Sequence, residues 1–250
     1  MDAFWWLGQM AFRVEMDGRV LYFDLYLSDS AHRLVPPPLH AEDVRDADFV
    51  FGSHDHDDHI DDDTWRKLAQ ASPQARFVVP GNLVDALSAR IGIDRHRFVC
   101  VDAGQTVDID GLQITGIAAA HERLAPDVHG RHANMIYVVR AGSKLICHTG
   151  DTCIYEGLES VLRRMGTFDA VMLPINGRDA ERLRRNCIGN MTYQEAVDLV
   201  GELAPRLAVP CHYDMFSGNT ENPALFAEYL SVKYPECQCW IGAHGSKVDF

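Results

Sequence analysis

The chain has 250 residues, of which 47% are hydrophobic and 24% are charged, a composition typical of globular proteins and unlike that of disordered or fibrous chains. Its 36 acidic and 23 basic residues give a formal charge of -13, which repels polyanions and makes nucleic acid or an anionic membrane an unfavourable partner. No apolar stretch approaches the roughly 20 residues required to cross a bilayer. These properties favour a small-molecule partner.

The cysteines and the opening segment indicate where the protein works. The 7 cysteines are an odd number without regular spacing, which does not suggest a disulfide framework. The opening MDAFWWLGQM lacks both the basic region and the long apolar region of a secretory signal. A reducing, cytoplasmic location is therefore expected. Because no linker is visible, residues 1–250 are predicted to form a single domain.

The first predicted elements are strands. Trp5 and Trp6 begin the first strand, where packing in the core or at a sheet edge is more expected than sugar stacking. The runs AFRVEM and RVLYFDL flank Asp17 and Gly18, a dipeptide that favours a two-residue hairpin turn. Further short apolar runs predict strands at 49–53, 76–80, 97–101, 112–118, 135–140, 144–150, 170–174 and 207–211.

Helical spacing and capping signals predict helices between several of these strands. The predicted helices span residues 62–68, 82–91, 155–165, 192–203 and 223–234. Early hairpins followed by strand–helix units indicate two sheets packed face to face, with helices on the outside. The predicted fold class is therefore α/β, a four-layer αββα sandwich.

Two segments are predicted to be long loops. Residues 28–40 contain three consecutive prolines, which are excluded from the interior of a sheet. Residues 176–192 contain the run ERLRR at 181–185. Either loop could cover a site or serve only as a surface connection.

The strongest chemical signal directly follows the apolar run FVFGS. His54, His56, Asp58 and His59 form the pattern His-x-His-x-Asp-His. Imidazole nitrogens and carboxylate oxygens are ligands of zinc, manganese and iron, so one turn of this kind can supply two adjacent metal sites. A solvated polar turn is the alternative interpretation.

Further metal ligands are expected just past other apolar runs. His121 follows ITGIAAA, Asp151 follows KLICHTG and His212 follows RLAVPC. A single His at the end of a strand is more often a hydrogen-bonded structural residue. In combination with the first motif, however, these three residues favour a metal centre that is assembled from distant parts of the chain.

These residues resemble those of the metallo-β-lactamase superfamily, whose fold is the αββα sandwich, and the resemblance spans nearly the whole chain. It implies two divalent metal ions, zinc or manganese, with iron also compatible. The implied ligands of one ion are His54, His56 and His121, and those of the second are Asp58, His59 and His212. Asp151 is implied to bridge both ions. Two divalent ions outweigh the carboxylates around them, so such a site attracts an anionic substrate locally despite the acidic chain.

Four strings resemble a narrower family, the L-ascorbate-6-phosphate lactonases. They are FWWLGQMAF, SHDHDDHID, HTGDTCIY and VPCHYDMFSGN, and the turn IGAHGSK at 241–247 is also similar. The resemblance implies a cytoplasmic enzyme that opens a sugar-acid lactone. In the lactonases the stretch equivalent to AAAHERL carries Asp and no His, so His121 gives this chain the fuller ligand set of other superfamily members.

The expected reaction is attack of a metal-bound hydroxide on an ester-like carbonyl. Asp58 and Asp151 are the predicted catalytic carboxylates, with Asp58 orienting the hydroxide and accepting its proton. Arg184 and Arg185 are predicted to bind a phosphate group, although an arginine-rich surface turn is the competing interpretation. The other predicted substrate contacts are Tyr155, Tyr213 and His244.

The expected partner is a small anionic substrate, with neither nucleic acid nor a membrane, and the aromatic start could serve an interface in a homo-oligomer. Two other functions remain open. A dinuclear centre of this kind also suits a phosphodiesterase acting on a small phosphodiester. Alternatively, the chain is a non-catalytic metal-binding protein with a closed pocket.

Overall fold

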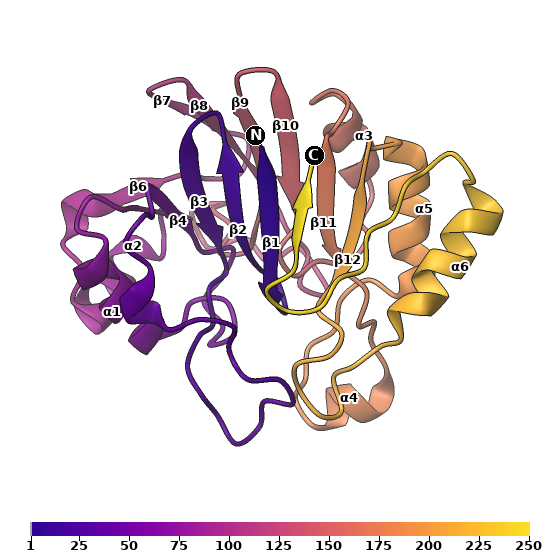
Figure 1. Cartoon of the computed structure of the whole chain (residues 1–250), viewed down its shortest axis with the longest axis horizontal. Coiled ribbons are helices and arrows are strands. Elements are labelled where there is room, and N and C mark those ends of the chain that lie inside the picture. The colour runs from indigo at the N-terminus through magenta and orange to yellow at the C-terminus, as the bar shows by residue number, and fades with distance from the viewer. Residues whose placement is uncertain (1) are drawn as a thin grey trace.

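Two β-sheets pack face to face, with helices on both outer sides (Figure 1). The computed structural model describes residues 2–250. In spatial order the first sheet contains β13 (Lys247–Asp249), β1 (Ala3–Gly8), β2 (Ala11–Met16), β3 (Arg19–Phe23), β4 (Phe49–Phe51), β5 (Arg76–Val79) and β6 (Phe98–Cys100). The second contains β12 (Ala208–Cys211), β11 (Ala170–Pro174), β10 (Lys144–His148), β9 (Met135–Ala141), β8 (Leu112–Ala118) and β7 (Thr106–Ile109).

The helices form the two outer layers. On the side of the first sheet lie α1 (Asp62–Ala71) and α2 (Val84–Ile91), and on the side of the second lie α3 (Leu158–Arg163), α5 (Tyr193–Leu203) and α6 (Pro223–Lys233) (Figure 1). Short 3-10 turns occur at Ala41–Asp43 and Arg95–Arg97. The predicted four-layer αββα sandwich is confirmed. Among the helices of residues 2–250, none has the length and apolar character that crossing a membrane requires.

Local sequence signals account for the hairpin and for several helix boundaries. Asp17 and Gly18 both have positive φ, 50° and 74°, as a tight turn between β2 and β3 requires. Thr192 and Glu195 form a capping box at the start of α5. The helix predicted from residue 155 begins only at Leu158, because Gly157 before it adopts a left-handed φ of 92°.

Some elements differ from the sequence predictions. The loop at 176–192 contains a short helix, α4 (Ala180–Arg184), which Asp179 caps by accepting from the Arg182 N–H. Of Cys237 and Cys239, which follow α6, only Cys239 pairs, in an isolated bridge with Ala208.

Alternating side chains divide the first sheet between two apolar clusters. Phe12 and Phe23 point into the core between the sheets, whereas their neighbours Ala11 and Tyr22 pack beneath the outer helices. Phe23 stacks on Phe51 at 4.4 Å, and Phe51 meets Tyr137 of the second sheet at 5.4 Å. The Tyr137 hydroxyl donates to the carbonyl of Gly52 at 3.1 Å. The two sheets are therefore joined just beneath the turn that follows β4.

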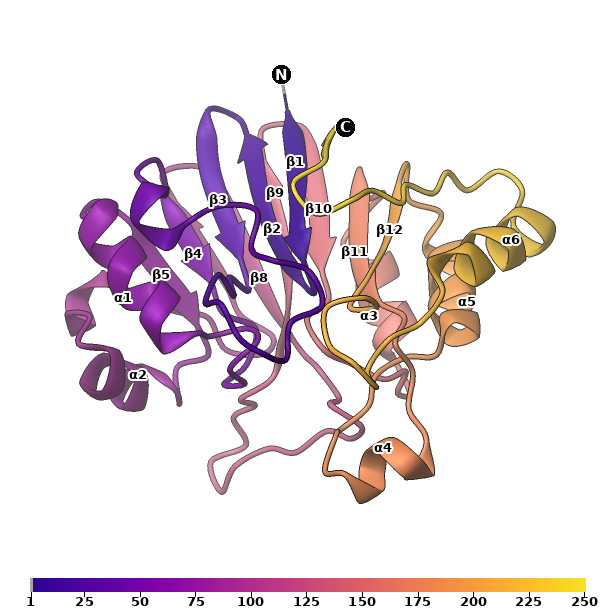
Figure 2. The same ribbon diagram turned by 60° about the horizontal axis from the view of Figure 1, so that its bottom comes forward.

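The strand directions bring several loops to one end of the sandwich. β3, β4, β5 and β6 run parallel to one another, as do β10, β11 and β12. β8 and β10 are both antiparallel to β9, so they share one direction. The loop after β8 and the loop that carries α4 extend from the same end of the molecule (Figure 2). Residues that follow these strands can therefore meet there.

Replacing Phe51 with Ala tests the join between the sheets. Phe51 is fully buried, so Phe51→Ala is expected to lower the free energy of unfolding by about 3–5 kcal/mol, through lost burial and the cavity that remains. Urea unfolding measures this loss. Val128, 96% exposed, is the control, and Val128→Ala is expected to change stability by less than about 0.5 kcal/mol. Equal effects of the two substitutions would contradict the packing described.

Candidate metal centre

The turn between β4 and α1 holds the predicted metal motif in a compact conformation. The His56 N–H donates to the His54 carbonyl at 3.1 Å, and the His59 N–H donates to the His56 carbonyl at 3.0 Å. Asp61 then caps α1 by accepting from the Asp63 N–H. His54 and His59 are buried at the floor of this turn, and Asp58 is partly exposed beside them. His56 is exposed, so the motif is partly solvated, but His54 and His59 anchor it in the interior.

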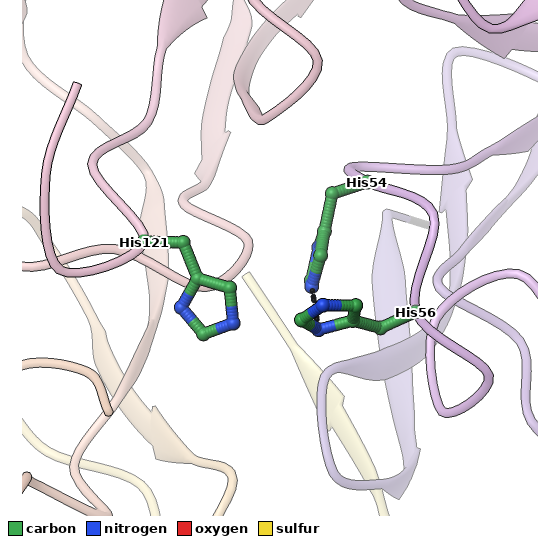
Figure 3. A group of neighbouring side chains, drawn as sticks. All are labelled: His54, His56 and His121. Carbon is green, nitrogen blue, oxygen red and sulfur yellow. Dashed lines mark hydrogen bonds between the residues drawn. The ribbon is translucent and has the colours of Figure 1, made fainter. Parts of the chain in front are cut away.

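A first group of donors joins the two halves of the molecule. His54 and His56 follow β4 of the first sheet, and His121 reaches them from the loop after β8 of the second (Figure 3). Their candidate ligand atoms all lie within 4.8 Å of one another. His54 Nε2 is 3.0 Å from His56 Nδ1, and the His121 ring centre is 5.1 Å from that of His54.

A second group lies beside the first. Asp58, His59 and His212 have candidate ligand atoms within 4.8 Å of one another, and so do His54, His59 and Asp151. The Asp151 carboxylate lies 3.1 Å from His212 Nε2, 3.5 Å from His59 Nε2 and 3.8 Å from His121 Nε2. Asp151 thus stands between the two groups. The structure brings all seven predicted ligands to one centre.

The polar atoms of this centre fit a metal ion. Within residues 2–250, His59 Nε2 and Asp151 Oδ1 are buried without a hydrogen-bond partner, although buried polar atoms almost always have one. Both atoms point into the cluster of neighbouring donors. Imidazole nitrogens and carboxylate oxygens at such spacing suit zinc, manganese and iron alike. The cluster is therefore able to bind metal.

Asp24 supports the centre and was missed by the sequence analysis. It is fully buried, and its Oδ2 lies 2.6 Å from His59 Nδ1, so this ring nitrogen carries the proton and Nε2 faces the centre. The Ser53 N–H and hydroxyl donate to the same carboxylate at 2.7 and 2.6 Å. One sequence signal existed. Asp24 directly follows β3, the parallel neighbour of β4, and therefore lies at the same edge as His54.

Close backbone approach is required where the two halves meet. Gly150 precedes Asp151 with a φ of 54°, and a Cβ there would stand 2.7 Å from the Cβ of Ser53 and 2.9 Å from the carbonyl oxygen of Met135. Only glycine permits this contact. Thr152 accepts from the Ala120 N–H at 3.0 Å and so fixes the start of the His121 loop. The left-handed φ values of Asp24 and His212, 43° and 61°, show further local strain at the centre.

Comparison with known proteins agrees with this architecture. Residues 21–213, which contain all seven converging donors, match the family described as the beta-lactamase superfamily domain. The chain belongs to this superfamily.

Relatives within the superfamily resemble it over most of their length. A UPF0173 metal-dependent hydrolase of Thermofilum pendens is 30% identical over 237 residues, covering 91% of this chain and 90% of the relative. Another, from Pyrococcus abyssi, is 26% identical and covers 91% of each chain. Among solved structures, the metallo hydrolase Igni18 of Ignicoccus hospitalis has a TM-score of 0.79 at 20% identity, covering 99% of this chain and 97% of that one.

In this beta-lactamase superfamily centre, burial and neighbouring charges shift the pKa values of several histidines and of Asp151 in different directions. Burial lowers the pKa of His54 and of His121. Burial also opposes charge on His212, but Asp151 and Asp58 outweigh it and raise the pKa of His212 to about 9. For Asp151, burial is outweighed by the neighbouring His212 and His59, which hold its pKa well below the usual range. Without a metal, protons on His212 and His59 therefore balance the buried carboxylates.

A cavity of about 520 Å³ opens beside Asp58. Asp58 and Arg185 both line it, so one of the predicted substrate contacts, Arg185, lies at the cavity. Its remaining lining residues are Tyr26, Ser30, His32, Asp57, Cys187, Phe216, Ser217, Gly218 and Asn219. The cavity borders the metal centre at Asp58, and the loops predicted to cover a site supply Ser30, His32, Arg185 and Cys187 of its wall.

The other four predicted substrate contacts lie outside the cavity lining. Arg184 is exposed and pairs with Glu181 at 2.8 Å. The Tyr155 hydroxyl donates to the carbonyl of Ala118 at 2.7 Å, Tyr213 packs on Trp6 at 5.0 Å, and His244 Nε2 lies 2.8 Å from Asp214. The structure does not bring these four side chains to the cavity beside Asp58. Trp6 itself is buried in the core, as the sequence analysis expected.

The affinity of the centre for zinc is expected to rise with pH. The pKa of His212 in the folded protein, about 9, exceeds the ordinary value of 6.5. A metal binds the neutral ring and must displace this proton, so His212 alone should make affinity increase by about tenfold per pH unit until about pH 9, and the proton on His59 should add to the rise. Competition with a chelator of known affinity measures this increase. An affinity that is flat or that falls over this range would contradict the predicted protonation.

The metal-free protein is the control, because the same proton has the opposite effect on its stability. The contribution of His212 to the free energy of unfolding is complete below its ordinary pKa of 6.5 and is lost as pH rises through about 9. Urea unfolding of the metal-free protein across the same range reports this loss.

Proposed function

We propose that this chain is a metal-dependent hydrolase that cleaves an ester-like bond of a small anionic substrate, and that sugar-acid lactones are its substrate class. The observation that carries the proposal is the convergence of seven nitrogen and oxygen donors from both sheets beside an open cavity. The relatives named as metal-dependent hydrolases support the reaction type. The similarity of four sequence segments to the L-ascorbate-6-phosphate lactonases supports the lactone.

The proposed ligands divide between two positions. His54, His56 and His121 hold one divalent ion. Asp58, His59 and His212 hold the second, with Asp151 in reach of both groups. Divalent ions bound at such a centre would lower the pKa of water to about 7 and polarise a carbonyl oxygen.

Asp58 is the carboxylate in position to accept a proton from the attacking water. Its side chain is 23% exposed and lines the cavity, whereas that of Asp151 is only 4% exposed and lies beneath it. A proton released by an attacking water at the cavity floor can therefore reach Asp58 directly. Asp151, buried among imidazole rings, acts instead by balancing their charge and holding the two groups together.

Arg185 is the cation placed to bind the anionic group of a substrate. Its neighbours on the loop are engaged by carboxylates, Arg178 by Glu195 and Arg184 by Glu181. Arg182 likewise pairs with Asp179. Arg185 instead donates to the carbonyl oxygens of Glu181 and Gly218, at 3.4 and 3.2 Å. No carboxylate of the described residues forms an ion pair with it, so its charge is available to the cavity.

Replacing Asp58 with Asn tests the reaction. Asp58→Asn retains the side-chain shape and one oxygen donor but removes the proton acceptor. Turnover of a lactone should therefore fall by at least about 100-fold while metal is partly retained. Metal analysis and steady-state kinetics measure the two effects, with Asp63→Asn, an exposed carboxylate of α1, as the control. Unchanged turnover would exclude the role of Asp58.

The wild-type protein distinguishes the remaining alternatives. A generic lactone and the chromogenic diester bis-p-nitrophenyl phosphate are offered side by side. Faster turnover of the diester would favour a small-molecule phosphodiesterase. Tight metal binding with neither substrate hydrolysed would favour a non-catalytic binding protein.

Arg185 and Arg184 form a matched pair for testing anion recognition. Loss of a charge-assisted hydrogen bond in Arg185→Ala should raise KM for a phosphorylated lactone by about 10- to 100-fold and leave an uncharged lactone little changed. Arg184→Ala removes an equal charge from the same loop but outside the cavity, and it should have little effect on either substrate. Equal losses on both substrates, or in both variants, would contradict an anion contact at Arg185.

A further inference from the structure

Gln9 is a buried amide at the metal centre that belongs to neither ligand group. It occupies the turn between β1 and β2 and is fully buried. Its Nε2 lies 3.0 Å from Asp58 Oδ2 and 3.3 Å from His212 Nε2, so the amide contacts two proposed ligands of the second ion. Gln9 also precedes residues 21–213, the part of the chain that matches the superfamily.

The backbone around Gln9 holds the amide in place. Gly8 and Gln9 both have left-handed φ, 105° and 51°, a conformation that is unfavourable for a residue with a Cβ. The Gln9 carbonyl accepts from the indole N–H of Trp6 at 3.0 Å and from the His212 N–H at 3.1 Å. The turn is thus tied both to the core and to the end of β12, and its side chain is aimed at Asp58.

The side chain of Gln9 makes no hydrogen bond that would explain it as a structural residue. Nε2 has hydrogen-bond partners only among residues of the centre, and Oε1 is buried with no partner within the part of the chain described. A buried oxygen without a partner is unfavourable. An apolar side chain of the same length would fill this space without that cost, so what the amide contributes is its contact with Asp58 and His212.

We propose that Gln9 is a positioning residue for Asp58. By donating to Oδ2, the amide fixes the rotation of the carboxylate, so that Oδ1 faces His59 Nε2, 3.7 Å away. Asp58 is partly exposed to the cavity, and without this bond its carboxylate can turn toward solvent. Gln9 thereby sets both the binding of the second ion and the orientation of the proton acceptor. This inference rests on the proposed function, since it assigns Asp58 the same two roles.

Replacing Gln9 with Met tests the inference, because Met keeps the length of the side chain and removes both polar atoms. In Gln9→Met, one metal site is expected to weaken by about 10- to 100-fold in chelator competition while the other is unchanged. The metal-free variant should unfold in urea at the same or a higher concentration than wild type. With a lactone, kcat should fall and KM should stay near its wild-type value. Gln9→Leu serves as a second apolar variant if Met does not fold.

A double-mutant cycle with Asp58→Asn separates positioning from other roles. If Gln9 acts through Asp58, then adding Gln9→Met to Asp58→Asn should change metal affinity and kcat by less than about twofold. The control is Gln113→Met, an exposed amide near the start of β8, whereas His121 follows the end of that strand; it should leave metal affinity unchanged.

Three results would overturn the inference. They are unchanged affinity at both metal sites in Gln9→Met, loss of stability of the metal-free variant with intact metal binding, and fully additive effects in the cycle. Each of these leaves the proposed hydrolase function standing if wild type binds metal and hydrolyses the lactone. A wild-type chain that takes up no metal would overturn the proposed function and this inference together.

Discussion

Buried charge at the open end of the sandwich is the constraint on which the rest of the structure depends. Asp24 and Asp151 lie out of water among the rings of His54, His59 and His212. Isolated charges at such depth are very unfavourable, so these carboxylates depend on the opposite charges and hydrogen-bond donors beside them. A bound cation would supply positive charge beside these carboxylates. Without a cation, protons on His212 and His59 supply it. Phe51, packed on Tyr137 of the second sheet, holds the two sheets close enough for the charges to meet.

The cavity beside the centre is lined by loops rather than by strands. Hydrogen bonds between polar side chains hold these loops together. Asn190 donates to the side chain of Asn176, which donates in turn to Asn219 on the cavity wall, at 3.1 and 2.8 Å. Arg182 also bonds to the carbonyl oxygens of Asn176 and Thr220. The α4 loop is therefore anchored to the loop after β12, and Arg185 is presented to the cavity by a supported segment.

Much of the layer architecture and of the donor set could be predicted because both follow from local pattern. Alternating or continuous apolar runs marked the strands, and a dipeptide with two positive φ values marked the hairpin. His121, Asp151 and His212 were recognisable because each follows an apolar run, and parallel strands place such residues at one edge. Substrate contacts were predicted less well. Proximity to a ligand in sequence suggested Tyr155 and Tyr213, but adjacent side chains near strand ends point to different faces, and both pack elsewhere.

By itself, the sequence determined the fold class, the strand order of the early hairpin and the identity of the residues that converge. These depend on periodicity and on residue chemistry within short windows. Only the tertiary structure decided that Asp24 orients His59, that Gln9 contacts Asp58, and that Arg185 rather than Arg184 faces the cavity. The first two contacts join residues that are far apart along the chain. The third distinguishes Arg184 from Arg185, which are neighbours at the end of a short helix and point in different directions. These contacts depend on how whole layers pack against one another, and a short window of sequence holds no information about that packing.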